Sequence, residues 1–223
     1  MYSSTDAIIL KNLNFKESSI ISRIFTYKHG KISIIAKGAR KSKNNIVSII
    51  ESGNIVHCTF YNGKSSLKTI KEISCKKIHS HTRSDLLRYY FSMAIIAIID
   101  KSIHEHQELK NLYNLSVHSL DSINRRKIDL DIIFIHFLIH FIDHLGFNII
   151  DNIKNTKNEI IETIDMINTC SDLNSINAIP IDSISNIKRI LYRHMKNHII
   201  DLNDIQAIHM IKNIKNETAT RTN

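Results

Sequence analysis

The sequence predicts an α+β protein in two parts: an N-terminal five-stranded OB-fold β-barrel followed by an all-α helical domain. Three observations lead to this prediction. Strand-like segments with turn signals fill about the first 75 residues, helical periodicity begins at Ser84, and basic residues are concentrated before that change. We therefore expect an OB-fold domain at residues 1–80 and a helical domain at residues 81–223.

Five segments of the first part have the composition and alternation of β-strands. They are residues 5–12, 19–27, 31–39, 55–61 and 66–73. Hairpin turns are predicted at His29-Gly30 and at Asn62-Gly63, because Asn-Gly between two β-prone segments is a strong hairpin signal. A flat sheet of five short strands would leave open edges, and closing the sheet into a barrel removes them.

The second part has the apolar period of helices. Ser84 is placed to cap the first helix, and the fully apolar residues 93–99 indicate a helix at the centre of a bundle. Gly146 is placed as a C-cap, and Pro180 precedes another predicted helix. The further helices are expected at residues 107–120, 129–145, 159–168, 183–199 and 201–212.

Charge is distributed unevenly over a chain whose net charge is +9. Residues 1–83 contain 15 basic and 4 acidic side chains, a net charge of +11, whereas residues 84–223 contain 15 and 17, a net charge of −2. Such a basic segment binds polyanions or anionic membrane surfaces. The apolar segments are too short to span a bilayer, and Asp6 lies where a signal peptide would be apolar, so we expect a cytoplasmic protein without membrane contact.

A cationic surface of the barrel is the strongest candidate site, since several cations on one surface release counterions from a nucleic-acid backbone. The candidate nucleic-acid-binding residues are Arg23, Lys31, Lys37, Arg40, Lys41, Lys43, Lys64 and Lys68. Tyr27, Phe60 and Tyr61 are close to these cations in sequence and could stack on bases or belong to the barrel core. The alternative for the lysines is a set of solvated strand faces.

No catalytic or cofactor-binding motif is found. His136, His140 and His144 repeat at helical spacing, but no His-Glu-x-x-His motif accompanies them, and we expect hydrogen-bonded imidazoles rather than a metal site. The three cysteines are too far apart for a paired Cys-x-x-Cys zinc site. Glycine-rich phosphate loops and nucleophile elbows are also absent from the sequence. We therefore expect a protein that is not an enzyme and that holds no metal or cofactor.

Several short motifs of the first 45 residues resemble the bacterial RecO recombination mediators in order and spacing. They are Thr5-Asp6-Ala7-Ile8-Ile9-Leu10-Lys11, Glu17-Ser18, Phe25-Thr26, His29-Gly30-Lys31 and Ala36-Lys37-Gly38-Ala39-Arg40. Lys31, Lys37 and Arg40 lie inside these motifs. The four-cysteine zinc module of many RecO proteins is not matched, because residues 148–182 contain Cys170 alone.

The resemblance implies an OB-fold domain followed by a helical domain for partner docking. It implies binding to single- and double-stranded DNA, annealing of complementary strands, and help in loading RecA onto strands covered by SSB. The implied partners are RecR and the C-terminal tail of SSB, in a bacterial cytoplasm at the nucleoid. Two alternatives stay open: an RNA-binding OB-fold module, which a preference for RNA would reveal, and a histidine-metal hydrolase.

Overall fold

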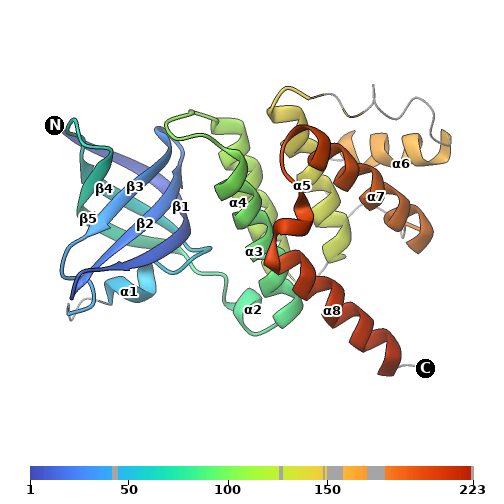
Figure 1. Ribbon diagram of the computed structural model, residues 1–223, viewed down its shortest axis with the longest axis horizontal. Helices are drawn as coiled ribbons and strands as arrows, with labels where there is room; N and C mark the ends of the chain where they lie inside the picture. The colour runs from blue at the N-terminus through green and yellow to red at the C-terminus, as the bar shows by residue number, and fades with distance from the viewer. Residues whose placement is uncertain (42–44, 126–127, 148, 150–157, 170–178, 222–223) are drawn as a thin grey trace. The chain divides into compact units, whose positions relative to one another are not determined.

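The structure is a computed structural model that describes residues 1–223 except 42–44, 126–127, 148, 150–157, 170–178 and 222–223. Figure 1 shows five strands, with the short helix α1 between β3 and β4, and then helices along the rest of the chain. The chain divides into two compact units, each of which is discontinuous in sequence. The first contains Met1–Ser80 and Ile96–Val117, and the second contains His81–Ile95 and His118–Asn223. Helices α3 and α4 therefore each contribute to both units.

The first unit contains a closed barrel of five strands in the order β1-β2-β3-β5-β4. The strands are β1 (Tyr2–Phe15), β2 (Ser19–Thr26), β3 (Gly30–Ala36), β4 (Ile55–Tyr61) and β5 (Leu67–Lys77). All neighbours are antiparallel except β3 and β5, which are parallel. This is the order of an OB barrel, and it confirms the predicted fold class.

Strand β1 closes the barrel because it is long enough to pair with two strands. Its first half pairs with β4 and its second half with β2, and the register shifts between Ile9 and Lys11. A bulge of this kind bends a strand, so one strand can turn the corner of the barrel. Alternate side chains of all five strands then face inward, where they form an apolar core with Phe60 as its largest fully buried member.

Both predicted hairpins are present, but their turns differ. Thr26 pairs with Gly30, whose positive φ of 64° suits glycine at this turn. The β4–β5 hairpin is also antiparallel, yet its loop spans residues 62–66, and Gly63 does not adopt a positive φ. The Asn62-Gly63 dipeptide thus predicted the hairpin correctly without forming the two-residue turn that it usually makes.

The helices are α1 (Ile46–Ile49), α2 (Ser80–Arg83), α3 (Leu86–Ser102), α4 (Lys110–Asn124), α5 (Leu130–His144), α6 (Asn158–Thr169), α7 (Ile181–His198) and α8 (Gln206–Arg221). One of the predicted caps, Gly146, is confirmed at α5, and Asp129 supplies an N-cap that was not predicted. Asp129 accepts hydrogen bonds from the backbone amides of Asp131 and Ile132, and Gly146 ends the helix at φ 86°. At α3, Asp85 rather than Ser84 accepts from the amide of Arg88, at 3.1 Å.

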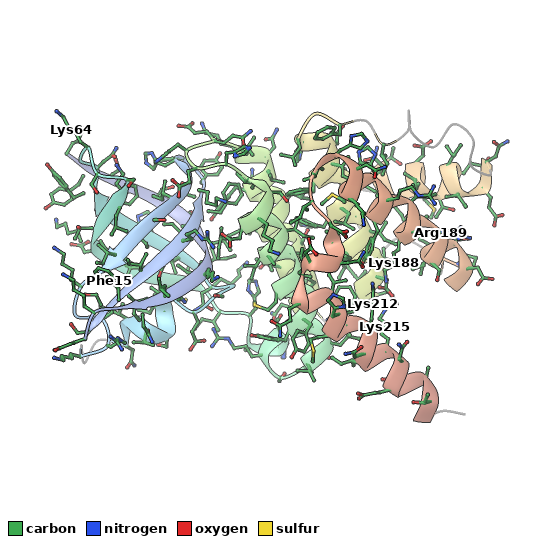
Figure 2. All side chains as sticks on the ribbon, viewed as in Figure 1. Phe15, Lys64, Lys188, Arg189, Lys212 and Lys215 are labelled. Carbon is green, nitrogen blue, oxygen red and sulfur yellow. The ribbon has the colours of Figure 1, made fainter. Side chains whose placement is uncertain are left out.

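Helix α5 is the apolar centre of the second unit and packs against α6 and α7. Its one charged side chain in the first turn, Asp131, is largely buried and forms ion pairs with Lys188 of α7 and Lys215 of α8 (Figure 2 labels both lysines). Burial alone would raise the pKa of Asp131, but the two ammonium groups lower it below its ordinary value. This carboxylate therefore joins three helices.

Candidate nucleic-acid interface

The outer face of strands β2 and β3 is covered by residues of the same unit. Asp100 of α3 is 12 % exposed and accepts a hydrogen bond from Arg23 of β2 at 2.6 Å. The backbone carbonyl of Asp100 accepts from the Lys31 ammonium at 2.5 Å. Lys31 is only 7 % exposed, and burial lowers its pKa, an effect that the Asp100 carboxylate partly offsets. Lys31 thus points into a packed contact, whereas the ion-paired Arg23 side chain stays 38 % exposed.

The segment between α3 and α4 continues this cover. The His106 amide donates to the Lys31 carbonyl at 3.0 Å, and Phe25 of β2 packs against Tyr113 with ring centroids 5.8 Å apart. OB folds commonly bind oligonucleotides on the face of strands 2 and 3. Here that face packs against residues 96–117, so the exposed cations of the loops at the two ends of the barrel become the candidate interface.

One group of exposed cations lies at the end of the barrel where β1 meets β2 and β3 ends. Gly38 has a φ of 69° and its carbonyl accepts from the Lys41 amide, so residues 38–41 form a turn with Ala39 in the core. Lys37, Arg40 and Lys41 are exposed around this turn. The Arg40 side chain donates to the Lys16 carbonyl and holds the β1–β2 loop (residues 16–18) in place. Lys43 lies outside the described residues.

We call this group the β1–β2 loop end and define it by Lys16, Lys37, Arg40 and Lys41. Among the described residues, Lys41 has one acidic partner, Glu17, at 3.5 Å, and both side chains are highly exposed. Exposed pairs of this kind contribute little and exchange readily for other anions. A phosphate group can therefore replace Glu17 at this position.

The second group of cations lies at the opposite end of the barrel, in and beside the β4–β5 loop (residues 62–66). Figure 2 shows Lys64 of this loop far from Phe15, which precedes the β1–β2 loop. Lys64 is exposed, and Lys68 is partly exposed and donates to the Gly63 carbonyl at 2.7 Å. The seven described residues of the predicted set are therefore not on one surface: they are divided between two loop ends and the covered face of β2 and β3.

A small polar hollow opens at this second end. Its volume is about 200 Å³, and it is lined by His29, Ile32, Phe60, Asn62, Lys68, His106 and Glu108. Burial lowers the pKa of His29 below its ordinary value. The hollow therefore places the Lys68 ammonium, the Glu108 carboxylate and two imidazoles near the β4–β5 loop.

The three aromatic candidates have three different environments. Phe60 is buried in the barrel core, which was one of the two predicted roles, the other being base stacking. Tyr27 packs edge-on against Tyr113, with ring centroids 5.6 Å apart. Tyr61 is exposed and faces Tyr2 across the β1–β4 pairing. Tyr2 was not among the predicted residues, because only the register of β1 against β4 brings it beside Tyr61.

The predicted histidine row lies along α5 in the second unit. His136 is buried, its ring centroid is 4.3 Å from that of His140, and burial lowers its pKa to about 4. His194 and His198 of α7 lie close together in the same way. Within the described ranges, no three metal-ligating side chains converge on one point. No described helix is both long and apolar enough to cross a bilayer.

Comparison with known proteins places these features in a family context. The family model "Recombination protein O N terminal" matches residues 1–79, and "Recombination protein O C terminal" matches residues 83–150. Together these matches cover the barrel and most of the following helices through α5.

Curated relatives are similar over the same region. A protein named DNA repair protein RecO from Thermoanaerobacter sp. (strain X514) is 30 % identical over 125 residues, which is 56 % of this chain and 50 % of the relative. Its namesake from Alkaliphilus metalliredigens (strain QYMF) is 27 % identical over 146 residues, 66 % of this chain and 59 % of the relative. The chain thus spans about half to three fifths of the length of these relatives.

Proposed function

Because the chain belongs to the RecO family of DNA repair proteins, we propose that it is a non-enzymatic DNA-binding mediator of recombination. It acts in DNA repair and homologous recombination. In this proposal it binds single- and double-stranded DNA, anneals complementary strands, and helps RecR to load RecA onto strands covered by SSB.

The observation that carries this proposal is the concentration of positive charge on the barrel. Residues 1–83 have a net charge of +11, and the loops at both ends of the barrel expose lysine side chains. Lys37 and Lys64 have no ion-pair partner among the residues that the structure describes. Such cations bind phosphates by counterion release, without dependence on base sequence.

Annealing follows from the same electrostatics. Two complementary strands repel each other, and cations that contact both strands on one protein surface reduce this repulsion and raise the local strand concentration. No hydrolysis of ATP is required for this step. The helical domain, whose net charge is close to zero, is the part that we assign to RecR and to the C-terminal tail of SSB, in the bacterial cytoplasm at the nucleoid.

The proposal is tested by annealing of two complementary oligonucleotides at low salt without ATP. We expect the purified protein to accelerate annealing and to lose this activity at high salt. An annealing rate equal to that of the protein-free control would contradict the proposal. An RNA oligonucleotide of the same sequence serves as competitor, and stronger competition by RNA would support an RNA-binding module instead.

The partner assignment needs a second experiment. Strands covered by SSB are annealed in the presence of the protein, and SSB without its C-terminal tail is the control. We expect acceleration with intact SSB and a loss of acceleration with tailless SSB. Equal rates with both forms would contradict a role of the tail.

A further inference from the structure

Two tyrosines form an exposed aromatic pair at the β4–β5 loop end of the barrel. Tyr2 and Tyr61 are direct cross-strand partners, and their ring centroids are 5.9 Å apart at an interplanar angle of 73°. They are 56 % and 52 % exposed, whereas Phe25 and Phe60 of the same barrel are almost fully buried. Burial in a core therefore does not account for these rings.

Positive charge surrounds this pair. The Lys71 ammonium lies 5.0 Å from the centre of the Tyr2 ring, and Lys64 is exposed in the loop that follows Tyr61. Lys71 has an acidic neighbour in Glu72, whose carboxylate is 3.9 Å from the Lys71 ammonium and is itself highly exposed. Aromatic faces that are open to solvent among cations are the combination that binds unpaired nucleotides.

Gly63 restricts where the Tyr61 ring can lie. A Cβ atom at residue 63 would be 2.6 Å from Cε1 of Tyr61, so the ring packs directly against the glycine backbone. Because Gly63 does not adopt a positive φ, alanine fits its backbone and would act by displacing the ring. Gly63 thus helps to fix the position of the Tyr61 ring.

We propose that Tyr2 and Tyr61 form a stacking site for the unpaired bases of single-stranded nucleic acid, with Lys64 and Lys71 on the adjacent phosphates. This inference rests on the proposed function and adds which end of the barrel distinguishes single strands from duplexes. Bases inside a duplex are already stacked on each other and do not offer a free face to the rings. Among the described residues, the β1–β2 loop end has one partly exposed ring, Phe15 beside Lys16, and no exposed pair of rings, so in this proposal it contacts backbone phosphates of either form.

The test compares two oligonucleotides of equal length and charge, a thymidine oligomer and an oligomer of abasic sites, by fluorescence anisotropy on the full chain. The stacking variant is Tyr2→Leu with Tyr61→Leu, and Tyr2→Phe with Tyr61→Phe retains the rings. Tyr89→Leu is the matched control, because Tyr89 is a partly exposed aromatic residue of the second unit and also packs edge-on against a tyrosine. Melting temperatures check that each variant folds.

We expect the unmodified protein to bind the thymidine oligomer about tenfold more tightly than the abasic one. The leucine variant should lose this preference but retain its affinity for blunt duplex, and the phenylalanine and Tyr89 variants should keep the preference. Gly63→Ala should weaken binding of the thymidine oligomer alone.

Equal affinity of the unmodified protein for the two oligomers, or an undiminished preference in the leucine variant, would overturn the stacking site while leaving DNA binding intact. Absence of binding to every oligomer and duplex at low salt would instead overturn the proposed function itself.

Discussion

Replacement of Lys37 and Lys41 by glutamine should flatten the salt dependence of DNA binding. Both side chains are exposed at the β1–β2 loop end, and neither is required by the core, because Ala39 between them supplies the buried contact of this turn. Arg40 is left unchanged, since its guanidinium holds the β1–β2 loop through the Lys16 carbonyl. The double variant thus removes two phosphate-binding charges and preserves the loop.

The size of the effect follows from the number of charges removed. Each neutralised phosphate of a single strand contributes about 0.7 to the slope of log K against log salt, so loss of two contacts should reduce the slope by about 1.4. Between about 50 and 200 mM salt, the variant should therefore lose about sevenfold less affinity than the unmodified protein. Fluorescence anisotropy with a labelled thymidine oligomer over a series of salt concentrations measures both slopes.

A control variant with the same net charge separates a local contact from a general charge effect. Lys196→Gln with Lys212→Gln also removes two positive charges, from exposed positions on α7 and α8 in the second unit. We expect this control to keep the slope of the unmodified protein. Equal slopes for the two double variants would refute the assignment of the phosphate contacts to the β1–β2 loop end.

Three further predictions concern stability. Asp131→Asn should lower the free energy of unfolding by about 2 kcal/mol in urea titrations, because it leaves two partly buried ammonium groups without a carboxylate. His136 has a pKa of about 4 in the folded protein against about 6.5 when unfolded, so the unfolded chain takes up the proton first as the pH falls. Stability should therefore decrease by about 3 kcal/mol between about pH 6.5 and pH 4, and His136→Leu should remove this part of the pH dependence. Gly30→Ala should lower the melting temperature, since φ is 64° there and the new Cβ would lie 2.3 Å from the Gln107 carbonyl oxygen.

The barrel was predictable from the sequence because its signals are local. Alternation of polar and apolar residues marked the strands, and His29-Gly30 marked a turn whose glycine adopts a positive φ. Helix α5 was equally clear, since its residues are mostly apolar and Gly146 follows its last turn. In each case the determining residues lie within a few positions of the element that they define.

Contacts between distant segments were not predictable in the same way. The start of α4 was expected at residue 107, but the backbone at 105–106 pairs with Lys31, and the helix begins at Lys110. The last helix was expected from residue 201, where Asp201 instead caps a short 3-10 turn and α8 begins at Gln206. The sequence contains the residues that cause these differences, but it does not show which residues they contact.

The candidate site shows the same limit. Lys31 and Arg23 alternate with apolar residues, as cations on the outer face of a strand do. They are engaged by Asp100, which lies about 70 positions further along the chain. Tyr2 became a candidate for base stacking because it lies beside Tyr61, and the two are neighbours only through the β1–β4 register. Charge per segment therefore indicated the class of ligand, whereas the exposed residues had to come from the structure.

The cover over β2 and β3 has a practical meaning for anyone who wishes to produce the barrel separately. A fragment that stops at residue 80 would lack Tyr113 and Asp100, and it would present Phe25 to water together with two unpartnered cations. Such a surface favours aggregation during expression. A fragment through residue 117 would keep this cover, but it would also carry residues 81–95 of the second unit and would expose Phe91, which packs against Phe134 of α5. A single cut in the chain therefore does not separate the barrel and its cover from residues of the second unit.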